Sequence, residues 1–467
     1  MVLKRDNSIF VDLQTLNSIL LRFKFLVMKK LYISFIILFT CFWSFGQTTI
    51  NIMDEVVFFD GYAGVVSEPT PEGVIRFRND LVTKKITDSQ LESIGEELTV
   101  NIVISALCDN YDRIGNVNLA LVPKGSTTYD PSVVSRIEIG RFITPFMNKN
   151  VNPTSVPYSF EVNNLAKILK SSEIYADFDF WLELEVFGVP YAANTQVAGC
   201  SGRNDVFEGK VDFVTNGSTS IDPDTYLQPL AMKMDFNNYQ ANATDAVGTT
   251  VKTINFTVDQ TIYDAKLYLI TSNHGANSGG EEYVRRVHNV EFDNTQVLTY
   301  TPGGKSCEPY RQYNTQGNGI YGSSPQSTSW WTSWNNWCPG DVIPIREIDL
   351  GTLASGSHSF KISVPAAQFA SQQGNFPLSL YLQGNESNLG ILESKENTRV
   401  YPNPAENLIK IDSDSKIEMV TLHNAEGKEI LKSENTQIDI STLQNGIYFV
   451  EIQLENGLTS VEKIVKR

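Results

Sequence analysis

One stretch of the chain concentrates carboxylates in a way that could support acid–base chemistry. Residues 177–187 read Asp-Phe-Asp-Phe-Trp-Leu-Glu-Leu-Glu-Val-Phe. In a strand, residues two apart share a face, so one face would carry the polar members of this run: Asp177, Asp179, Trp181, Glu183 and Glu185. Like charges on an enclosed face repel, which would raise the pKa of at least one carboxyl. An exposed outer face of a sheet is the alternative, and the pattern leaves both open.

Two further segments combine groups that could bind and activate a substrate. Residues 108–117, Cys-Asp-Asn-Tyr-Asp-Arg-Ile-Gly-Asn-Val, follow an apolar strand at 100–107 and place two acids and an arginine beside a tyrosine. Residues 273–288 form a Gly-rich loop that brings two acids and then two arginines. Polar loops often carry function, but either segment could equally be a solvated turn.

The elements that must position these groups are mostly strands. Apolar and polar residues alternate in four segments: 252–258, 265–271, 358–364 and 376–383. Helical periodicity is scarce, and 163–170 is the best candidate. Many short strands with Gly, Asn and Pro turns predict antiparallel sandwiches or jelly rolls. The polar segment 216–228 predicts a boundary between two β domains.

Composition excludes several classes of function. The 467 residues include 37 Lys and Arg against 53 Asp and Glu, a formal net charge of −16, which argues against a nucleic-acid partner. The four histidines, His274, His288, His358 and His423, form no HxH or HxxH pair, which argues against a copper or zinc centre. No Gly-x-Ser-x-Gly or His-Glu-x-x-His motif is present, which excludes serine-hydrolase and zincin mechanisms. We therefore expect no metal and no cofactor.

The N-terminal residues predict export. Met28-Lys-Lys precedes an apolar run that is short for a bilayer-spanning helix and ends in small residues, as in a signal peptide. We expect residues 28–46 to be that signal peptide and residues 1–27 to be an extension upstream of the true start. Loss of Cys41 leaves four cysteines in an oxidising compartment, consistent with two disulfides in any of three pairings.

The C-terminal residues change in character after about 391. A polar linker at 391–397 is followed by Val400-Tyr-Pro-Asn-Pro, by Leu443-Gln-Asn-Gly-Ile-Tyr-Phe-Val and by the basic end Lys463-Ile-Val-Lys-Arg. These motifs resemble the C-terminal sorting domain of proteins that Bacteroidetes export by type IX secretion. The resemblance implies that 398–467 form a small β-sandwich, that the type IX machinery is a partner, and that the protein is secreted or held at the cell surface.

The region from about 50 to 385 resembles the bacterial peptide-N-glycosidase F amidases. The segment 108–117 is similar to their catalytic loop, and 137–146, Ile-Glu-Ile-Gly-Arg-Phe-Ile-Thr-Pro-Phe, to a second block. The pattern Glu-(aromatic)-x-x-Arg-x-His at 282–288 and Cys307…Trp337-Cys-Pro-Gly are similar to the second half of the family. The resemblance implies an all-β fold of two eight-stranded antiparallel jelly rolls side by side, at 47–225 and 226–390, with the site at their interface.

The same resemblance implies roles for individual residues. Asp112 falls on the catalytic aspartate and Glu282 on a second-domain glutamate, and we choose Glu183 as the third acid over Asp179 or Glu185. Expected substrate contacts are Arg113, Tyr111, Trp181, Trp334 and Trp337. The aromatic members of this set offer flat apolar faces for sugar rings, and Trp334 stands where the family has an arginine.

The resemblance also implies two disulfides. Cys307 and Cys338 match a family disulfide. Cys108 matches a cysteine whose local partner is missing here, so we pair it with Cys200.

The implied activity is hydrolysis of the amide between the innermost N-acetylglucosamine and asparagine, which converts asparagine to aspartate and releases the whole glycan. Carboxylates of differing pKa could supply the base and the acid without a metal. We therefore predict a monomeric, metal-independent amidase that acts on N-glycoproteins or glycopeptides. The alternative is a non-catalytic N-glycan-binding or adhesion protein on the same fold. The absent arginine at Trp334 supports that alternative, and retention of Asp112 together with Glu282 counts against it.

Overall fold

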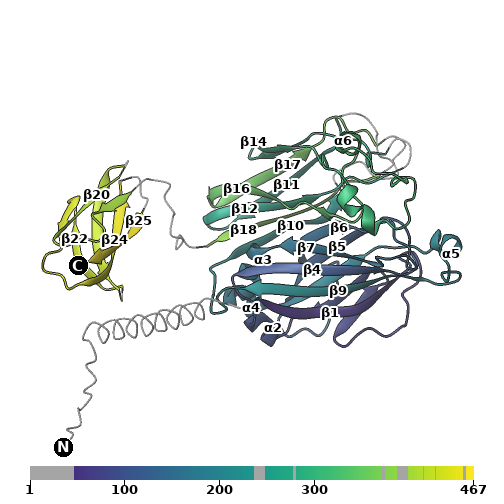
Figure 1. Cartoon of the computed structure of the whole chain (residues 1–467), viewed down its shortest axis with the longest axis horizontal. Coiled ribbons are helices and arrows are strands. Elements are labelled where there is room, and N and C mark those ends of the chain that lie inside the picture. The colour runs from purple at the N-terminus through teal and green to yellow at the C-terminus, as the bar shows by residue number, and fades with distance from the viewer. Residues whose placement is uncertain are drawn as a thin grey trace, which may run out of the picture. The chain divides into compact units, whose positions relative to one another are not determined.

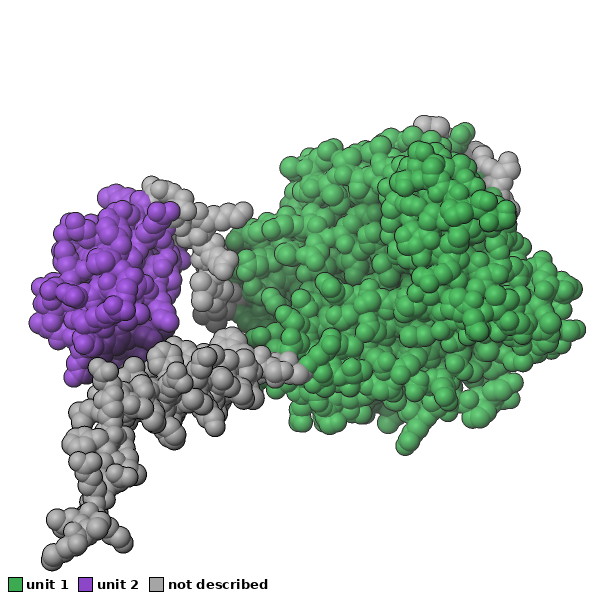
Figure 2. Space-filling view, in the orientation of Figure 1, with its two compact units in different colours: residues 1–386 green, residues 387–467 purple. Residues whose placement is uncertain are grey.

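The computed structural model describes residues 47–235, 248–276, 280–369, 374–386, 398–413, 415–425, 427–455 and 459–467. The chain divides into two compact units, Met1–Glu386 and Ser387–Arg467 (Figure 2). The expected signal peptide at 28–46, the upstream residues 1–27 and the linker at 391–397 lie outside the described residues. Among the described helices, none is both long and apolar enough to cross a membrane.

Two antiparallel sheets form the first half of unit 1 (Figure 1). The first has the order β1-β9-β4-β7, with β1 (Thr48–Phe59), β9 (Asp205–Asn216), β4 (Glu97–Ala106) and β7 (Ser155–Glu161). The second has the order β15-β6-β5-β8-β3-β2, with β15 (Val342–Ile343), β6 (Ser135–Ile143), β5 (Ile114–Pro123), β8 (Phe178–Val186), β3 (Leu81–Lys85) and β2 (Val74–Arg78). Alternate residues of β4 and β8 face each other in one core, as the period of two requires.

Four short helices surround these sheets: α2 (Asp88–Glu92), α3 (Asn163–Lys170), α4 (Ser172–Asp177) and α5 (Ala193–Gln196). The helix predicted at 163–170 is confirmed as α3, whose apolar face, including Leu165 and Ile168, is buried. Ser171 ends α3 and begins α4, because its hydroxyl accepts a hydrogen bond from the Ile174 N–H as an N-cap.

The second half of unit 1 contains two four-stranded antiparallel sheets. One has the order β10-β18-β12-β16, with β10 (Tyr226–Asp235), β18 (Pro377–Asn385), β12 (Ile262–Thr271) and β16 (Arg346–Leu353). The other has the order β11-β17-β13-β14, with β11 (Val251–Val258), β17 (Gly356–Ser363), β13 (His288–Phe292) and β14 (Thr295–Tyr300). The four strands predicted from alternation are confirmed within one to three residues as β11, β12, β17 and β18. A long connection between β14 and β15 carries a 3₁₀ helix, Glu308–Tyr313, and α6 (Thr328–Thr332).

The two halves contact each other directly. Strand β15 follows the second-half strand β14 in the chain but pairs with β6 of the first half, Val342 with Phe142 and Ile343 with Arg141. Strand β6 also packs against β10, β12 and β18. The all-β fold is therefore confirmed. Among the described residues each half contributes nine strands to the chain rather than the expected eight. Strand β2 pairs with β3 at one edge of the first half, and β15 comes from the second half but pairs with β6. Both halves belong to one compact unit, and the boundary at 225/226 stays a prediction.

Unit 2 is a β module with a core of its own. One sheet contains β19 (Arg399–Tyr401), β20 (Leu408–Asp412) and β23 (Gln437–Asp439). The other contains β22 (Glu429–Ser433), β21 (Ile417–Asn424), β24 (Gly446–Leu454) and β25 (Thr459–Lys466). Residues such as Ile409, Val420 and Val450 are fully buried between them. A separate core is what an independently folding module requires.

Candidate active site

The loop between β4 and β5 is organised by the buried Asp109. Its carboxylate accepts hydrogen bonds from the backbone N–H groups of Tyr111 (2.9 Å) and Val189 (2.7 Å). It also accepts the Arg113 Nε–H at 2.6 Å, which forms an ion pair. Asp109 thus holds the loop and orients Arg113. The neighbouring Asp112 is half-buried in the same loop.

The loop between β12 and β13 presents the second acid. The Gly275 N–H donates to Oε2 of Glu282 at 2.9 Å, and the Glu282 N–H donates to the Gly275 carbonyl at 3.3 Å. Gly275 has φ of +116°, in the left-handed region that glycine tolerates. The Asn336 side chain donates to the carbonyls of Glu281 and Glu282 at 3.0 and 2.5 Å. Backbone and amide contacts therefore hold Glu282 in place.

Asp112 and Glu282 come from different halves of unit 1 and interact electrostatically. Burial, reinforced by the negative charge of Glu282, raises the pKa of Asp112 to about 7, while Arg113 opposes the rise. Burial also raises the pKa of Glu282, opposed by hydrogen bonds from the Gly275 N–H and from Tyr283. Two interacting carboxyls disfavour the state in which both are ionised, so one can keep a proton while the other is charged. The pair can therefore supply one acid and one base.

Three of the five expected substrate-binding side chains lie near this pair. The Trp334 ring packs edge-on against Tyr283, which is hydrogen-bonded to Glu282, with the ring centroids 5.3 Å apart. Tyr111 precedes Asp112 and lies 5.4 Å from the Arg113 guanidinium carbon, measured to the ring centroid. Tyr111 and Trp334 pack against the same small hydrophobic cluster. Arg113 and Tyr111 thus flank Asp112 in the chain, and Trp334 packs on the tyrosine that is hydrogen-bonded to Glu282.

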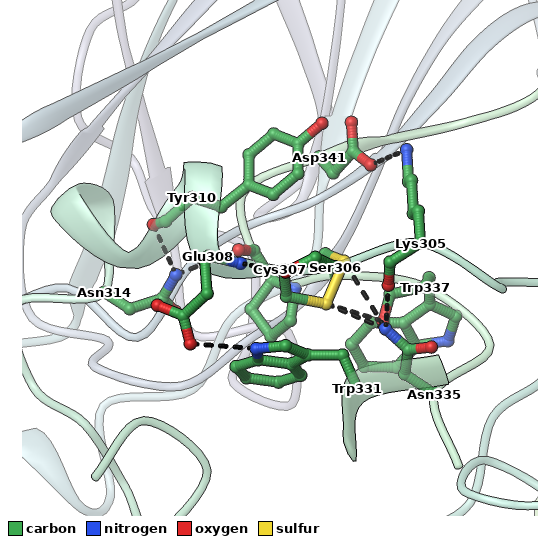
Figure 3. Close-up of a disulfide and its surroundings, with 12 residues drawn as sticks. Lys305, Ser306, Cys307, Glu308, Tyr310, Asn314, Trp331, Asn335, Trp337 and Asp341 are labelled. Atoms are coloured by element: carbon green, nitrogen blue, oxygen red, sulfur yellow. Dashed lines mark hydrogen bonds and ion pairs between the residues drawn. A yellow bond between two sulfur atoms is a disulfide. The ribbon is translucent and has the colours of Figure 1, made fainter. Parts of the chain in front are cut away.

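Both expected disulfides are present. Cys307 and Cys338 are joined with their Cα atoms 5.3 Å apart, and Cys108 and Cys200 with theirs 5.5 Å apart. Figure 3 shows the first bridge beside Asn335, whose amide donates to the Lys305 carbonyl at 3.0 Å. The bridge closes the segment that carries Trp334 and Asn336, so it ties the Glu282 supports to the core.

Trp337 is buried against the start of the loop that carries Glu282. Its indole N–H donates to the Asn273 carbonyl at 2.8 Å, and its ring lies 5.9 Å from the ring of His274. Only 9% of Trp337 is exposed. Burial of Trp337 argues against the expected sugar contact, which stays a prediction.

The structure does not bring Glu183 to Asp112. Glu183 is fully buried and accepts hydrogen bonds from Asn118 (3.0 Å), Tyr129 (2.9 Å) and Arg136 (3.1 Å). Its backbone partner Asn118 lies four residues into β5, so the Asp112 end of that strand is ~13 Å further along the sheet. The choice of Glu183 as the third site acid is therefore not supported.

The polar face of β8 is buried, but lysine and arginine side chains neutralise the negative charges of its acids. Trp181 packs edge-on against Tyr129 with the ring centroids 5.6 Å apart and is 4% exposed, so its burial also argues against the expected sugar contact, which stays a prediction. Burial acts to raise the pKa of Asp179, but Lys85, the Gly125 N–H and Lys124 lower it below its usual range. The pKa of Glu185 is likewise lowered. Burial acts to raise it, but the positive charges of Lys233 and Arg78 outweigh the effect of burial. Neither Asp179 nor Glu185 has the raised pKa expected on this face, because each of the two is paired with two cations.

Several residues of the site had no predicted role. Gly275, Tyr283 and Asn336 act through contacts between distant segments, which sequence spacing cannot reveal. Glu138 and Arg141 are different, since two opposite charges inside the otherwise apolar run 137–146 are a signal that could have been used. Both side chains are fully buried.

One group of acids could hold a cation away from these residues. Glu173, Asp224 and Glu386 have carboxylate oxygens within 4.8 Å of one another. They are exposed or half-buried and come from elements other than those that carry Asp112 and Glu282. Nothing links them to the site.

Comparison with known families agrees with this arrangement. The two β-sandwich halves and the matched families define an N-glycanase-like protein. The family "Peptide-N-glycosidase F, N terminal" matches residues 49–201, and "Peptide-N-glycosidase F, C terminal" matches 238–383. The chain belongs to the peptide-N-glycosidase F family. Residues 399–467 match the "Secretion system C-terminal sorting domain", which marks the protein for type IX secretion to the cell surface or the extracellular space.

Solved structures show the same fold at low identity. PNGF-II in space group P21 aligns with a TM-score of 0.53 and 18% identity over 73% of this chain and 66% of that one. Its structure in space group C2 aligns with a TM-score of 0.52 and 18% identity over 73% of this chain and 65% of that one. PNGase F, a glycosylasparaginase from Flavobacterium meningosepticum, aligns with a TM-score of 0.45 and 16% identity over 73% of this chain and 96% of that one. The chain thus spans about two thirds of the length of PNGF-II. Among curated proteins, no relative matches.

Proposed function

We propose that this protein is an exported amidase that hydrolyses the bond between the innermost N-acetylglucosamine and the asparagine of N-glycoproteins or glycopeptides. The observation that carries the proposal is the pairing of Asp112 with Glu282, one from each half, with the pKa of Asp112 raised to about 7. An amide is a poor electrophile with a poor leaving group, so its hydrolysis needs both a base for water and an acid for the departing nitrogen. The pair supplies both near neutral pH.

The surroundings of the two carboxyls favour a division of labour. Glu282 accepts hydrogen bonds from Gly275 and Tyr283, which stabilise its ionised form. Its negative charge then keeps the proton on Asp112. In this mechanism Glu282 removes a proton from water, the water oxygen bonds to the side-chain carbonyl carbon, and the carbon–nitrogen bond breaks. Asp112 gives its proton to the leaving glycosylamine nitrogen, and the asparagine becomes an aspartate.

Arg113, Tyr111 and Trp334 are the groups placed to hold the substrate. The guanidinium offers several hydrogen-bond donors to carbonyl or hydroxyl oxygens, and the two rings offer apolar faces to sugars. The amidase needs no metal in this scheme, because both proton transfers use carboxyls.

The test is incubation of the mature protein with a denatured N-glycoprotein, followed by mass analysis of the peptide and the glycan. Conversion of asparagine to aspartate with release of an intact glycan supports the proposal. Cleavage between the two core sugars would instead identify an endoglycosidase. A catalytically inert variant with both acids replaced, Asp112→Asn with Glu282→Gln, is the control for contaminating activity.

A non-catalytic glycan-binding protein is the second candidate. Its support is the group of tryptophans, in which Trp330 packs edge-on against Trp334 with the centroids 5.2 Å apart and is 39% exposed. Exposed aromatic rings are suited to binding sugars without chemistry. Tight binding of a glycopeptide that stays uncleaved by the wild type would favour this candidate over the amidase.

A further inference from the structure

A buried ion pair lies on β6 where the two halves meet. Arg141 donates through Nε and Nη2 to the two carboxylate oxygens of Glu138 at 2.8 and 2.7 Å, and neither side chain is exposed. Residues three apart in a regular strand face opposite sides, but the register here shifts between Val117–Gly140 and Asn118–Glu138. The β-bulge at Ile139 therefore turns both charged side chains to one face.

This ion pair reaches across to the second half through two serines. The Arg141 Nη1 donates to the Ser272 hydroxyl and to the Pro377 carbonyl, both at 2.8 Å. The Ser379 hydroxyl donates to Glu138. Ser272 directly follows β12, whereas Ser379 lies within β18. The same pair thus has one link to a loop, at Ser272, and two to the regular strand β18, at Pro377 and Ser379.

The Ser272 link continues to Glu282. The Ser272 hydroxyl is 2.6 Å from Nε2 of His274, and the backbone of His274 pairs with Asn375 in both directions, at 3.0 and 3.1 Å. Burial, followed by the charge of Arg141, lowers the pKa of His274 to about 3, so the imidazole is neutral. The next residue, Gly275, donates its N–H to the Glu282 carboxylate.

We propose that Arg141 and Glu138 form a positioning pair, which fixes residues 272–275 so that the Gly275 N–H meets Glu282. This inference rests on the proposed amidase function. A buried ion pair adds little net stability compared with apolar residues of the same volume, because both charges lose their water. The forked guanidinium is instead suited to holding several oxygens in a set geometry, as it does here with a carboxylate, a hydroxyl and a carbonyl.

Two matched serine variants test the proposal. Ser272→Ala and Ser379→Ala each remove one hydroxyl from the same ion pair, but only the first breaks the path to Gly275. Ser272→Ala should lower kcat by about tenfold with KM changed less than about twofold, because small displacements of a reacting group slow chemistry more than binding. It should also move the acid limb of kcat/KM to higher pH, because a weaker Gly275 hydrogen bond makes Glu282 harder to ionise. Ser379→Ala should keep the wild-type kcat and pH profile.

Hydrogen exchange gives a readout that needs no activity. The Gly275 amide should exchange faster in Ser272→Ala than in the wild type, and at the wild-type rate in Ser379→Ala. Equal effects of the two variants on exchange and on kcat would overturn the positioning role. Absence of turnover in the wild type would instead refute the amidase proposal, and the exchange result would still decide whether the ion pair orders Gly275.

Discussion

Replacing Asp112 by asparagine should remove activity and at the same time stabilise the protein. The asparagine side chain has the same shape but cannot give or take a proton. General acid–base groups contribute ~10²–10⁴ in rate, so we expect turnover to fall at least about a hundredfold. Arg113 and Tyr111 keep their contacts with the rest of the loop, so glycopeptide binding should change little.

The stabilising effect follows from the raised pKa. The folded protein binds a proton at Asp112 more tightly than the unfolded chain does, because the pKa rises from 3.8 to about 7. Stability is therefore lost as the pH rises through this interval, and above about pH 7 the loss reaches at most ~4 kcal/mol. Asparagine removes the charge but still buries an amide, so we expect a gain of about 1–3 kcal/mol at pH 8. Below pH 4 the gain should disappear.

Denaturant unfolding of wild type and variant at pH 4 and pH 8 measures this gain, with kcat and KM determined on the same samples. Asp109→Asn is the matched control from the same loop. It should lower stability by about 1–3 kcal/mol, because the amide keeps only one of the two oxygens. One of the two backbone N–H groups loses its acceptor, and Arg113 loses its charged partner. Near-normal turnover in folded Asp112→Asn protein, or a loss of stability at pH 8, would refute the reasoning.

Four further outcomes can be checked. The kcat/KM of the wild type should change around pH 7, where Asp112 titrates, and a flat profile from pH 6 to 8 would contradict its role. Cys307→Ser with Cys338→Ser should cost roughly 3–4 kcal/mol in denaturant unfolding, because a bridge between residues 31 apart no longer restricts the unfolded chain. Deletion of 398–467 should leave purified activity intact and abolish delivery to the surface, as followed by fractionation. Glu183→Gln should lower stability by up to about 3 kcal/mol, since Arg136 loses its charged partner, yet keep kcat within about twofold.

The period-two pattern predicted much of the fold because one face of each strand meets a core. Alternation located β11, β12, β17 and β18, and the apolar periodicity of 163–170 located α3. Burial drives both patterns, so both can be read without knowing the partners. Short strands such as β2 and β3, with five residues each, carry too short a pattern to be located in this way.

The residues of the site were harder to predict than the strands, because their positions depend on packing between distant segments. Asp112 and Glu282 were chosen from the family resemblance, because the residue types of their two loops fit a solvated turn equally well. Glu183 belongs to an equally suggestive pattern, yet its face is covered by Tyr129 and Arg136. The β-bulge at Ile139 brings Glu138 and Arg141 to the same face of β6, whereas strict alternation would place them on opposite faces. Such a shift in register cannot be counted from sequence.

The pairing of Val342 and Ile343 with β6 has a consequence for how the protein can be made and used. Until residue 343 has left the translocation channel, the β6 edge of the first half has unpaired backbone groups, which are sites for aggregation. The two halves should therefore complete their folding together, and neither should be soluble when expressed alone. The sheet that the two halves share also prevents a hinge motion that would move them apart. Under the amidase function proposed above, a glycoprotein would reach the acids by presenting its own asparagine on a flexible or unfolded segment, which predicts faster release from denatured than from native substrates.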